Sequence, residues 1–334
     1  MTTDAAWLAM GAEAALEPDL PIVDPHHHLW DRAGHRYLVD ELLADIGSGH
    51  NIVATVHIEC GSMYRADGPV ALRSVGETEF ANGIAAMSAS GGYGSTRVCA
   101  GIVGHADLSL GPAAGEVLDA HMAAAPARFR GIRHAAGWDE SPAIRNSHSN
   151  PPRGLLGDAG FRAGFAGLAP RGLLFEAWLY HPQIGELTDL ARAFPETTIV
   201  FDHFGGPLGI GPYAGRGADI FSAWKRDVAA LAACPNVVAK LGGLAMKING
   251  GRWHKQVRPP SSEELATAHR DWYLTAIDIF GPERCMFESN FPVDKVSIGY
   301  GALWNAFKRL AAPFSASEKA ALFHDTARSI YRLP

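Results

Sequence analysis

The sequence predicts a single (β/α)8 barrel (TIM barrel), and three observations support this fold class. Eight short apolar or β-branched runs recur along the chain, each short enough for a barrel strand. Most gaps between them hold an amphipathic, Ala-rich stretch, and repetition of strand and helix is typical of a parallel sheet. No nucleotide-type glycine fingerprint accompanies the repeats, which favours a closed barrel over an open sheet. We expect the strands at residues 21–24, 52–59, 98–103, 129–134, 173–180, 198–203, 236–241 and 284–289.

The clearest helical stretches follow the later strands, and two connections between elements are unusually long. The connections cover residues 137–171 after the fourth strand and 242–271 after the seventh, and both are rich in Gly, Pro, Ser and Arg. Long connections at the C-terminal face of a barrel commonly form substrate lids. We expect residues 1–20 to be an N-terminal extension and residues 21–334 to form the barrel. The expected helices are residues 116–125, 184–194, 221–233 and 263–280.

Composition excludes several classes of partner. The 334 residues are 47% hydrophobic and 19% charged, which is typical of a globular protein with a large core. The net charge of −6, without a basic stripe, argues against nucleic-acid binding. No segment approaches the roughly 20 apolar residues of a membrane helix, and the N-terminus does not resemble a secretory signal. We therefore expect a cytoplasmic protein with a small-molecule substrate, and a homo-oligomer stays open. Four widely spaced cysteines are expected to be buried reduced thiols: Cys60, Cys99, Cys234 and Cys285.

Polar residues gather where the predicted strands end. His26 and His28 follow the first strand, and side chains two residues apart on a strand point the same way. Two such imidazoles can share one metal ion or hold one polarised oxygen. Barrel enzymes keep their chemistry at the C-terminal ends of the strands, so the other polar residues there are also candidates. They are His57, Glu59, His105, Asp107, Arg133, His134, Tyr180, His181, Asp202, His203, Lys240, Glu288 and Asn290.

Four segments together resemble the amidohydrolase superfamily. They are the His-x-His pair, Asp-His-Phe-Gly-Gly-Pro at 202–207, Phe-Glu-Ser-Asn-Phe-Pro at 287–292 and Thr-Ala-Arg-Ser-Ile-Tyr at 326–331. The chain is most similar to the amidohydrolase-related branch that includes sugar lactonases and 2-pyrone-4,6-dicarboxylate lactonase, from about residue 21 to the C-terminus. The resemblance implies a barrel and hydrolysis at a carbonyl centre. It also implies that His26, His28 and His203 touch the reacting groups.

Asn290 departs from the family pattern, which normally carries an Asp at this place in the eighth strand. An amide cannot act as a base near neutral pH, although it can position a water or donate to an oxyanion. The base must then come from elsewhere, with Glu59, Glu288, Asp294 and His203 as candidates. We favour Glu59, at the end of the second strand. Glu288 shares a strand face with Asn290, and we expect it to form a buried ion pair with Lys240.

The sequence leaves the cofactor open. A divalent ion such as Zn²⁺ would be held by His26 and His28 with Glu59 or His203 as a third ligand, and it would lower the pKa of a bound water. Without a metal, the histidines would hydrogen-bond the carbonyl of the substrate and stabilise charge on its oxygen. Asn290 weakens the metal alternative, because cations prefer an anionic oxygen to an amide.

The leading hypothesis is a hydrolase that opens a lactone of a small carboxylated or polyhydroxylated compound. Arg133 and Lys240 offer cations for a carboxylate, and His181, Tyr64 and Trp253 are further candidates for the substrate pocket. One alternative is a metal-dependent decarboxylase of an aromatic or unsaturated acid, against which Asn290 argues. Another is a barrel that has lost catalysis and only binds a small ligand.

Overall fold

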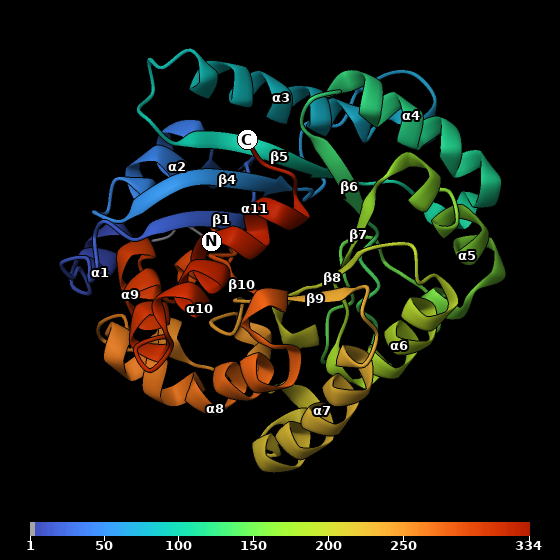
Figure 1. Cartoon of the computed structure of the whole chain (residues 1–334). Helices are drawn as coiled ribbons and strands as arrows, with labels where there is room; N and C mark the ends of the chain where they lie inside the picture. The colour runs from blue at the N-terminus through green and yellow to red at the C-terminus, as the bar shows by residue number, and fades with distance from the viewer. Residues whose placement is uncertain (1–3) are drawn as a thin grey trace.

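The computed structural model describes residues 4–334, and its main feature is an eight-stranded parallel barrel (Figure 1). Neighbouring strands pair in chain order. A parallel bridge between His27 and Phe291 links the last strand to the first, so the sheet closes. The strands are β1 Pro21–His27, β4 Asn51–Ile58, β5 Arg97–Gly104, β6 Phe129–Arg133, β7 Leu174–Ala177, β8 Ile199–Phe201, β9 Val237–Leu241 and β10 Cys285–Phe287.

Helices surround the barrel, and a short hairpin, β2 Trp30–Arg32 with β3 His35–Tyr37, follows the first strand. The longest helix, α8, begins with a capping box, in which the Ser261 hydroxyl accepts from the Glu264 amide and the Glu264 carboxylate accepts from the Ser261 amide. The helices are α1 Ala5–Ala9, α2 Val39–Ile46, α3 Val75–Ala89, α4 Ala114–Ala124, α5 Ala159–Phe165, α6 Ile184–Ala193, α7 Gly217–Ala232, α8 Ser262–Phe280, α9 Tyr300–Leu310, α10 Ala316–Ala320 and α11 Thr326–Ile330.

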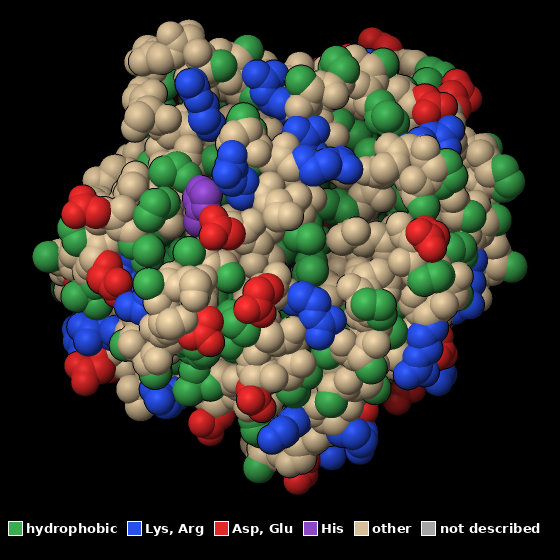
Figure 2. Space-filling model, viewed as in Figure 1, with side chains coloured by type: hydrophobic (Ala, Val, Ile, Leu, Met, Phe, Trp, Pro, Cys, Tyr) green, Lys and Arg blue, Asp and Glu red, His purple; other side chains and the backbone are tan. Residues whose placement is uncertain are grey.

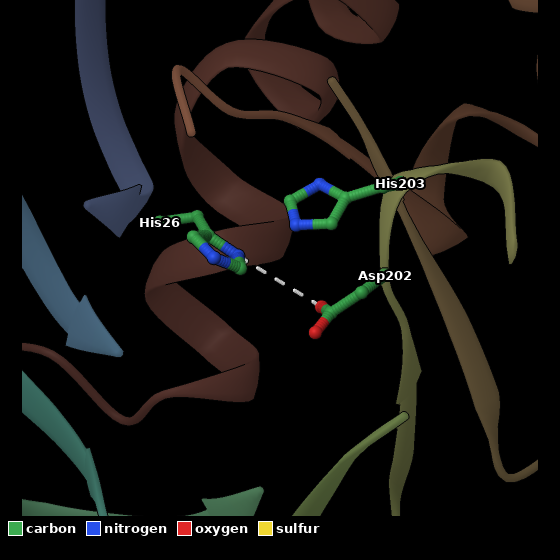
Figure 3. A group of neighbouring side chains, drawn as sticks. All are labelled: His26, Asp202 and His203. Atoms are coloured by element: carbon green, nitrogen blue, oxygen red, sulfur yellow. Dashed lines mark ion pairs between the residues drawn. The ribbon is translucent and has the colours of Figure 1, made fainter. Parts of the chain in front are cut away.

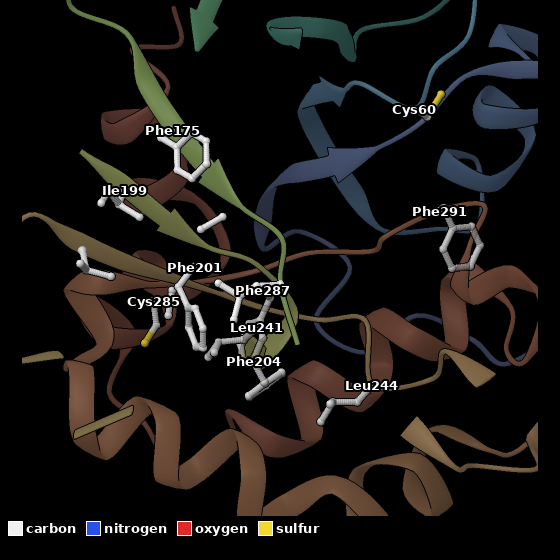
Figure 4. Close-up of a cluster of buried hydrophobic side chains, with 14 of the residues drawn as sticks. Cys60, Phe175, Ile199, Phe201, Phe204, Leu241, Leu244, Cys285, Phe287 and Phe291 are labelled. Atoms are coloured by element: carbon white, nitrogen blue, oxygen red, sulfur yellow. The ribbon is translucent and has the colours of Figure 1, made fainter. Parts of the chain in front are cut away.

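The strands alternate between two cores, as period-two geometry requires. On β8, Ile199 and Phe201 pack outward against the helices, whereas Val200 points into the barrel. On β10, Phe287 packs outward and Met286 inward. Figure 4 shows part of the outer core, where aromatic rings from β7, β8 and β10 fill the space between strands and helices. This alternation fixes which polar residues can face the barrel interior at the strand ends.

All eight predicted strands are confirmed, with bounds that differ by a few residues. The four expected helices are also present, as α4, α6, α7 and α8. The long connection after β6 holds α5, and the one after β9 runs without an α-helix until α8 begins at Ser262. The four cysteines are free and buried, as expected. Within the described residues, no helix is long and apolar enough to span a membrane.

The segment before β1 is tied to the outside of the barrel by polar contacts with α8 and α9. Lys308 Nζ donates to the carbonyl oxygens of Leu16 and Glu17 at 2.6 and 2.8 Å. The Glu13 carboxylate accepts from the Ser262 amide at 2.6 Å. The first three residues of the extension expected at residues 1–20 lie outside the described residues, and its division from the barrel at residue 21 stays a prediction.

Candidate active site

A layer of four ionisable side chains forms the floor of the site. Each side chain points into the barrel, either from the strand or from the residue that directly follows it. Each comes two residues after an apolar interior residue. All four are fully buried: Glu176 after Leu174, Asp202 after Val200, Lys240 after Val238 and Glu288 after Met286. Buried charges persist only when paired, and this layer pairs them with one another and with the histidines above.

Lys240 lies at the centre of the layer. Its Nζ donates to Glu176 Oε2 at 2.7 Å and lies 3.7 Å from Asp202 Oδ1 and 3.3 Å from His26 Nδ1. Burial, and then the neighbouring Asp202, raises the pKa of Glu176 well above its ordinary value. The pKa of Asp202 is lowered, because Lys240 and further hydrogen-bond and charge partners outweigh the effect of burial. Asp202 therefore carries the negative charge of this carboxylate pair.

Glu288 bridges two histidines. Its Oε2 lies 2.8 Å from His26 Nδ1, and its Oε1 lies 2.6 Å from His203 Nδ1. Gly242 on the neighbouring strand end makes room, since a Cβ there would lie 2.4 Å from Glu288 Cγ. The ion pair predicted between Glu288 and Lys240 is therefore wrong. Lys240 instead contacts Glu176 and Asp202. Because β9 lies between β8 and β10, its lysine could have turned towards either side.

His26 and His28 point their Nε2 atoms at one locus, 3.3 Å apart. The Nδ1 atom of His28 lies 2.8 Å from the Ile58 carbonyl oxygen, as that of His26 does from Glu288. His28 Nδ1 thus has an acceptor, which leaves its Nε2 as an acceptor at the locus, whereas His26 Nδ1 lies between the Glu288 carboxylate and the Lys240 ammonium. Burial lowers the pKa of both histidines well below the ordinary value, so both imidazoles are neutral near pH 7.

This pair fits a divalent ion. Two nitrogens bound tetrahedrally to one ion at about 2.1 Å lie about 3.4 Å apart, close to the separation observed. The acceptor on His28 Nδ1 is a usual support of a metal-binding histidine. Arg133 Nη1 also lies 3.4 Å from His26 Nε2, so a guanidinium already brings positive charge to the same locus.

A second group of potential ligands, His26, Asp202 and His203, lies on the other side of the His26 ring (Figure 3). Their ligand atoms lie within 4.8 Å of one another, and His26 Nδ1 is 3.9 Å from Asp202 Oδ1. The Lys240 ammonium lies beside both of these atoms. A cation thus lies beside each locus, Lys240 at this one and Arg133 at the His26–His28 pair.

Glu59 is fully committed to neighbours. Arg133 Nε donates to its Oε1 at 2.7 Å, Arg133 Nη2 donates to its backbone oxygen at 2.5 Å, and His148 Nε2 lies 3.0 Å from its Oε2. Burial would raise the pKa of Glu59, but Arg133 and His148 outweigh it and hold the pKa well below the ordinary value. The carboxylate predicted to be the base or a metal ligand is thus weakly basic and occupied by Arg133 and His148.

Asn290 lies beside the histidines at the closing seam of the barrel. Its backbone amide donates to the His26 carbonyl oxygen at 3.0 Å, and its side-chain amide donates to Asp294 Oδ1 at 3.2 Å. Its φ of 55° lies in the left-handed region that Asn tolerates better than most residues. The donation to Asp294 fixes the amide, so the side-chain oxygen of Asn290 remains as an acceptor near the site.

A cavity of about 300 Å³ opens above the layer. Its wall combines cations with aromatic rings, and none of the described residues that line it is Asp or Glu. The predicted residues His28, Arg133, His203 and Asn290 line it, while His26 lies just below. The other lining residues are Trp30, Arg32, Cys60, Arg145, Asn146, His148, Trp178, Tyr180, Met246, Ile248 and Val293.

Four residues predicted to bind substrate are not part of this wall. Lys240 lies in the buried layer beneath it. The His181 ring accepts from the Leu208 amide at 3.2 Å and packs on Tyr213, and the Trp253 ring packs edge-on against His269. Tyr64 is 38% exposed on the loop after β4. Their assignment as substrate contacts has no support from this cavity.

Three groups near the site were not singled out from the sequence. His148 and Arg145 come from the long connection after β6, and nothing local to that loop shows where it folds. Glu176 could have been predicted, because it is a single carboxylate in an otherwise apolar strand. Charged residues in buried strands require partners, which points to the layer described above.

Comparison with known proteins places this geometry in a family. The amidohydrolase family model matches residues 23–333. The chain belongs to the amidohydrolase family. It is 35% identical to the uncharacterized protein y4mH of Sinorhizobium fredii, over 94% of this chain and 99% of that protein. It is also 27% identical to L-fucono-1,5-lactonase of Burkholderia multivorans, over 62% of this chain and 64% of the lactonase.

Solved structures share the fold across the same length. An amidohydrolase from Burkholderia multivorans with bound zinc has a TM-score of 0.71 at 24% identity, covering 94% of this chain and 99% of its own. A putative 2-pyrone-4,6-dicarboxylic acid hydrolase from Pseudomonas putida has a TM-score of 0.62 at 18% identity, covering 94% and 98%. A 5-carboxyvanillate decarboxylase from Sphingomonas paucimobilis has a TM-score of 0.57 at 15% identity, covering 94% and 100%. The chain is thus a hydrolase enzyme of the amidohydrolase family, and its barrel fold is shared by proteins named for hydrolysis and for decarboxylation.

Proposed function

We propose that this amidohydrolase opens a lactone that carries a carboxylate group, by attack of water on the ring carbonyl. The observation that carries the proposal is the cavity wall, on which His28, Arg133 and His203 converge and to which no Asp or Glu of residues 4–334 contributes. Such a wall attracts an anionic substrate and stabilises negative charge that develops on a carbonyl oxygen. The similarity to a lactonase supports the same reaction class.

Substrate binding falls to the residues at the mouth. Arg32 and Arg145 are exposed and line the cavity, and the structure gives Arg145 no ion-pair partner within residues 4–334. A guanidinium binds a carboxylate through two parallel hydrogen bonds, which orients the ring as well as holding it. The Trp178 ring also lines the cavity, where a substrate ring can pack against it.

Charge stabilisation falls to Arg133 and the neutral histidines. Arg133 is anchored by Glu59 through Nε and Nη2, so its Nη1 atom is held towards the Nε2 locus. A carbonyl oxygen placed there would accept from Nη1, and the fixed guanidinium would meet the developing negative charge without reorganisation. A divalent ion held by the Nε2 atoms of His26 and His28 would supply Lewis acidity at the same place.

His203 takes the role of base in this proposal. Glu288 Oε1 accepts from its Nδ1, which leaves Nε2 with a lone pair for the proton of the attacking water. The buried Glu288 carboxylate also stabilises the imidazolium that results, as a carboxylate does in hydrolytic triads. Glu288, two residues before Asn290, thereby supplies a carboxylate that acts through His203.

The test is an acid-release assay on a panel of carboxylated lactones and neutral sugar lactones, with metal content measured before and after chelation. We expect ring opening of carboxylated lactones without release of carbon dioxide. Carbon dioxide production without ring opening would establish the decarboxylase alternative instead. An inactive parent whose Asn290→Asp variant hydrolyses lactones would show that the natural chain has lost catalysis.

A further inference from the structure

A second cavity, of about 360 Å³, lies at the opposite end of the barrel and contains four arginines. Arg97 begins β5, Arg128 and Arg130 surround the start of β6, and Arg332 follows α11. Figure 2 shows Lys and Arg side chains gathered on this face, near the C-terminal end of the chain that Figure 1 places over β5. We call this group the basal arginine cavity.

The hydrogen bonds of Arg128, Arg130 and Arg332 go to neutral groups. Arg128 Nη1 donates to Asn82 Oδ1 at 2.8 Å, and Arg332 Nη1 donates to the Gly172 carbonyl oxygen at 2.8 Å. Arg130 donates to four backbone carbonyl oxygens, of Ala127, Phe129, Tyr331 and Arg332. None of the four forms an ion pair with Asp or Glu within residues 4–334.

Some other surface arginines in the chain are paired with carboxylates instead. Arg171, for example, donates to both carboxylate oxygens of Asp119, and Arg258 donates to both of Glu264. In the basal arginine cavity the positive charges instead repel one another. Burial, and then Arg332 and Arg128, lowers the pKa of Arg130. The fold holds the four groups together with neutral partners, so their charge remains available to a ligand.

We propose that the basal arginine cavity binds a small anion that carries two or more phosphate groups. A concave surface lined by charges of one sign concentrates the opposite charge, and guanidinium groups match phosphate oxygens in pairs. Four cations suit a polyphosphate better than a single carboxylate, and about 360 Å³ admits only a small molecule. The site is independent of the proposed hydrolysis, because it lies at the other end of β6 from Arg133.

The test is isothermal titration calorimetry of the full chain with pyrophosphate as the probe. We expect one bound pyrophosphate per chain, with affinity that falls at high salt because surface charges are screened. The double variant Arg97→Gln/Arg128→Gln should bind at least ~10-fold more weakly, as two of four cations are lost. Its folding should persist, since Asn82 is the only side-chain hydrogen-bond partner of these two arginines among residues 4–334. Urea unfolding checks this point.

Two matched variants separate the outcomes. Arg226→Gln removes an exposed cation on α7, and Arg145→Gln removes one from the active-site cavity. Both should bind pyrophosphate as the parent does. The proposal is overturned if the double variant binds normally, if either control loses as much affinity, if inorganic phosphate binds as tightly as pyrophosphate, or if no heat of binding appears at millimolar pyrophosphate.

Discussion

Arg130 and Arg133 belong to the same strand, β6, yet they meet opposite surroundings at opposite ends of the barrel. Arg133 is 5% exposed and held by Glu59, with Asp202 3.7 Å from its Nη1. Arg130 is partly exposed and held by backbone carbonyl oxygens. A cation paired with carboxylates becomes a fixed part of the structure, whereas one held by neutral dipoles keeps its charge for a ligand.

The largest expected effect comes from removing each arginine in turn. Arg133→Met leaves Glu59 buried without its main partner, which costs about 3–5 kcal/mol of unfolding free energy. Arg130→Met loses hydrogen bonds to carbonyl groups that can turn to water, at about 1–2 kcal/mol. Urea unfolding measures both values. Equal losses at the two positions would show that the carboxylate pairing does not distinguish the two ends.

The next effect is on turnover and is confined to the active-site end. His26→Ala and His203→Ala should each lower kcat/KM at least ~100-fold, or about 2.7 kcal/mol, if they act in charge stabilisation and proton transfer as proposed. His324→Ala is the matched control, because this histidine pairs with Asp325 beside α11, at the other end. Near-normal rates in both active-site variants would remove the assigned roles.

Acid should also weaken the active-site end, where histidines are buried in neutral form. Burial lowers the pKa of His181 to about 4. Its contribution to stability is present above the unfolded pKa of about 6.5 and is lost as the pH falls towards 4. Between pH 7.5 and 5 this single group should cost about 2 kcal/mol.

Urea midpoints at the two pH values measure the loss. His181→Asn keeps an acceptor for the Leu208 amide but cannot take up a proton. It should therefore be less sensitive to acid by about the same 2 kcal/mol. An identical pH response in parent and variant would contradict the burial argument for this histidine. The arginines of the basal cavity keep their charge over this range, so that end should not add to the change.

The smallest effect concerns the choice of substrate. Arg145→Ala should raise KM for a carboxylated lactone about 10-fold, or about 1.4 kcal/mol, and leave KM for a neutral lactone within about twofold. Steady-state kinetics on the two substrate types measure the difference. A similar change for both substrates would mean that Arg145 shapes the cavity and does not read the carboxylate.

Much of the barrel could be predicted because it depends on local patterns. Each strand is a short apolar run, and alternation on the strand places Asp202, Lys240 and Glu288 on the inner face with Val200, Val238 and Met286. The same alternation predicts that Glu176 also lies on the inner face. Pairing within that layer could not be predicted, because a lysine on β9 can reach either neighbouring strand.

The residues at the mouth of the active site were harder to predict from the sequence. His148 and Arg145 reach the cavity only because the long connection after β6 folds back over the barrel. Some of its hydrogen bonds, such as the Ser147 amide to the Gly137 oxygen, join residues within the loop, and others, such as His148 to Glu59, reach distant elements, so none leaves a periodic pattern in the sequence. The pairing of Glu59 with Arg133, which makes Glu59 a weak base, could not be predicted either, because it joins strands that are distant in the sequence.

The seam that closes the barrel bears on how this protein is made in the cell. The Ser289 hydroxyl donates to the His26 carbonyl oxygen, a contact between residues 263 positions apart, and the His28 amide donates to the Phe291 oxygen at 2.8 Å. The ribosome delivers the histidine pair well before Glu288 and Asn290. A nascent chain therefore carries the histidine pair before the residues that complete the site are made. Truncated products of translation carry the histidines without the carboxylate that orients them.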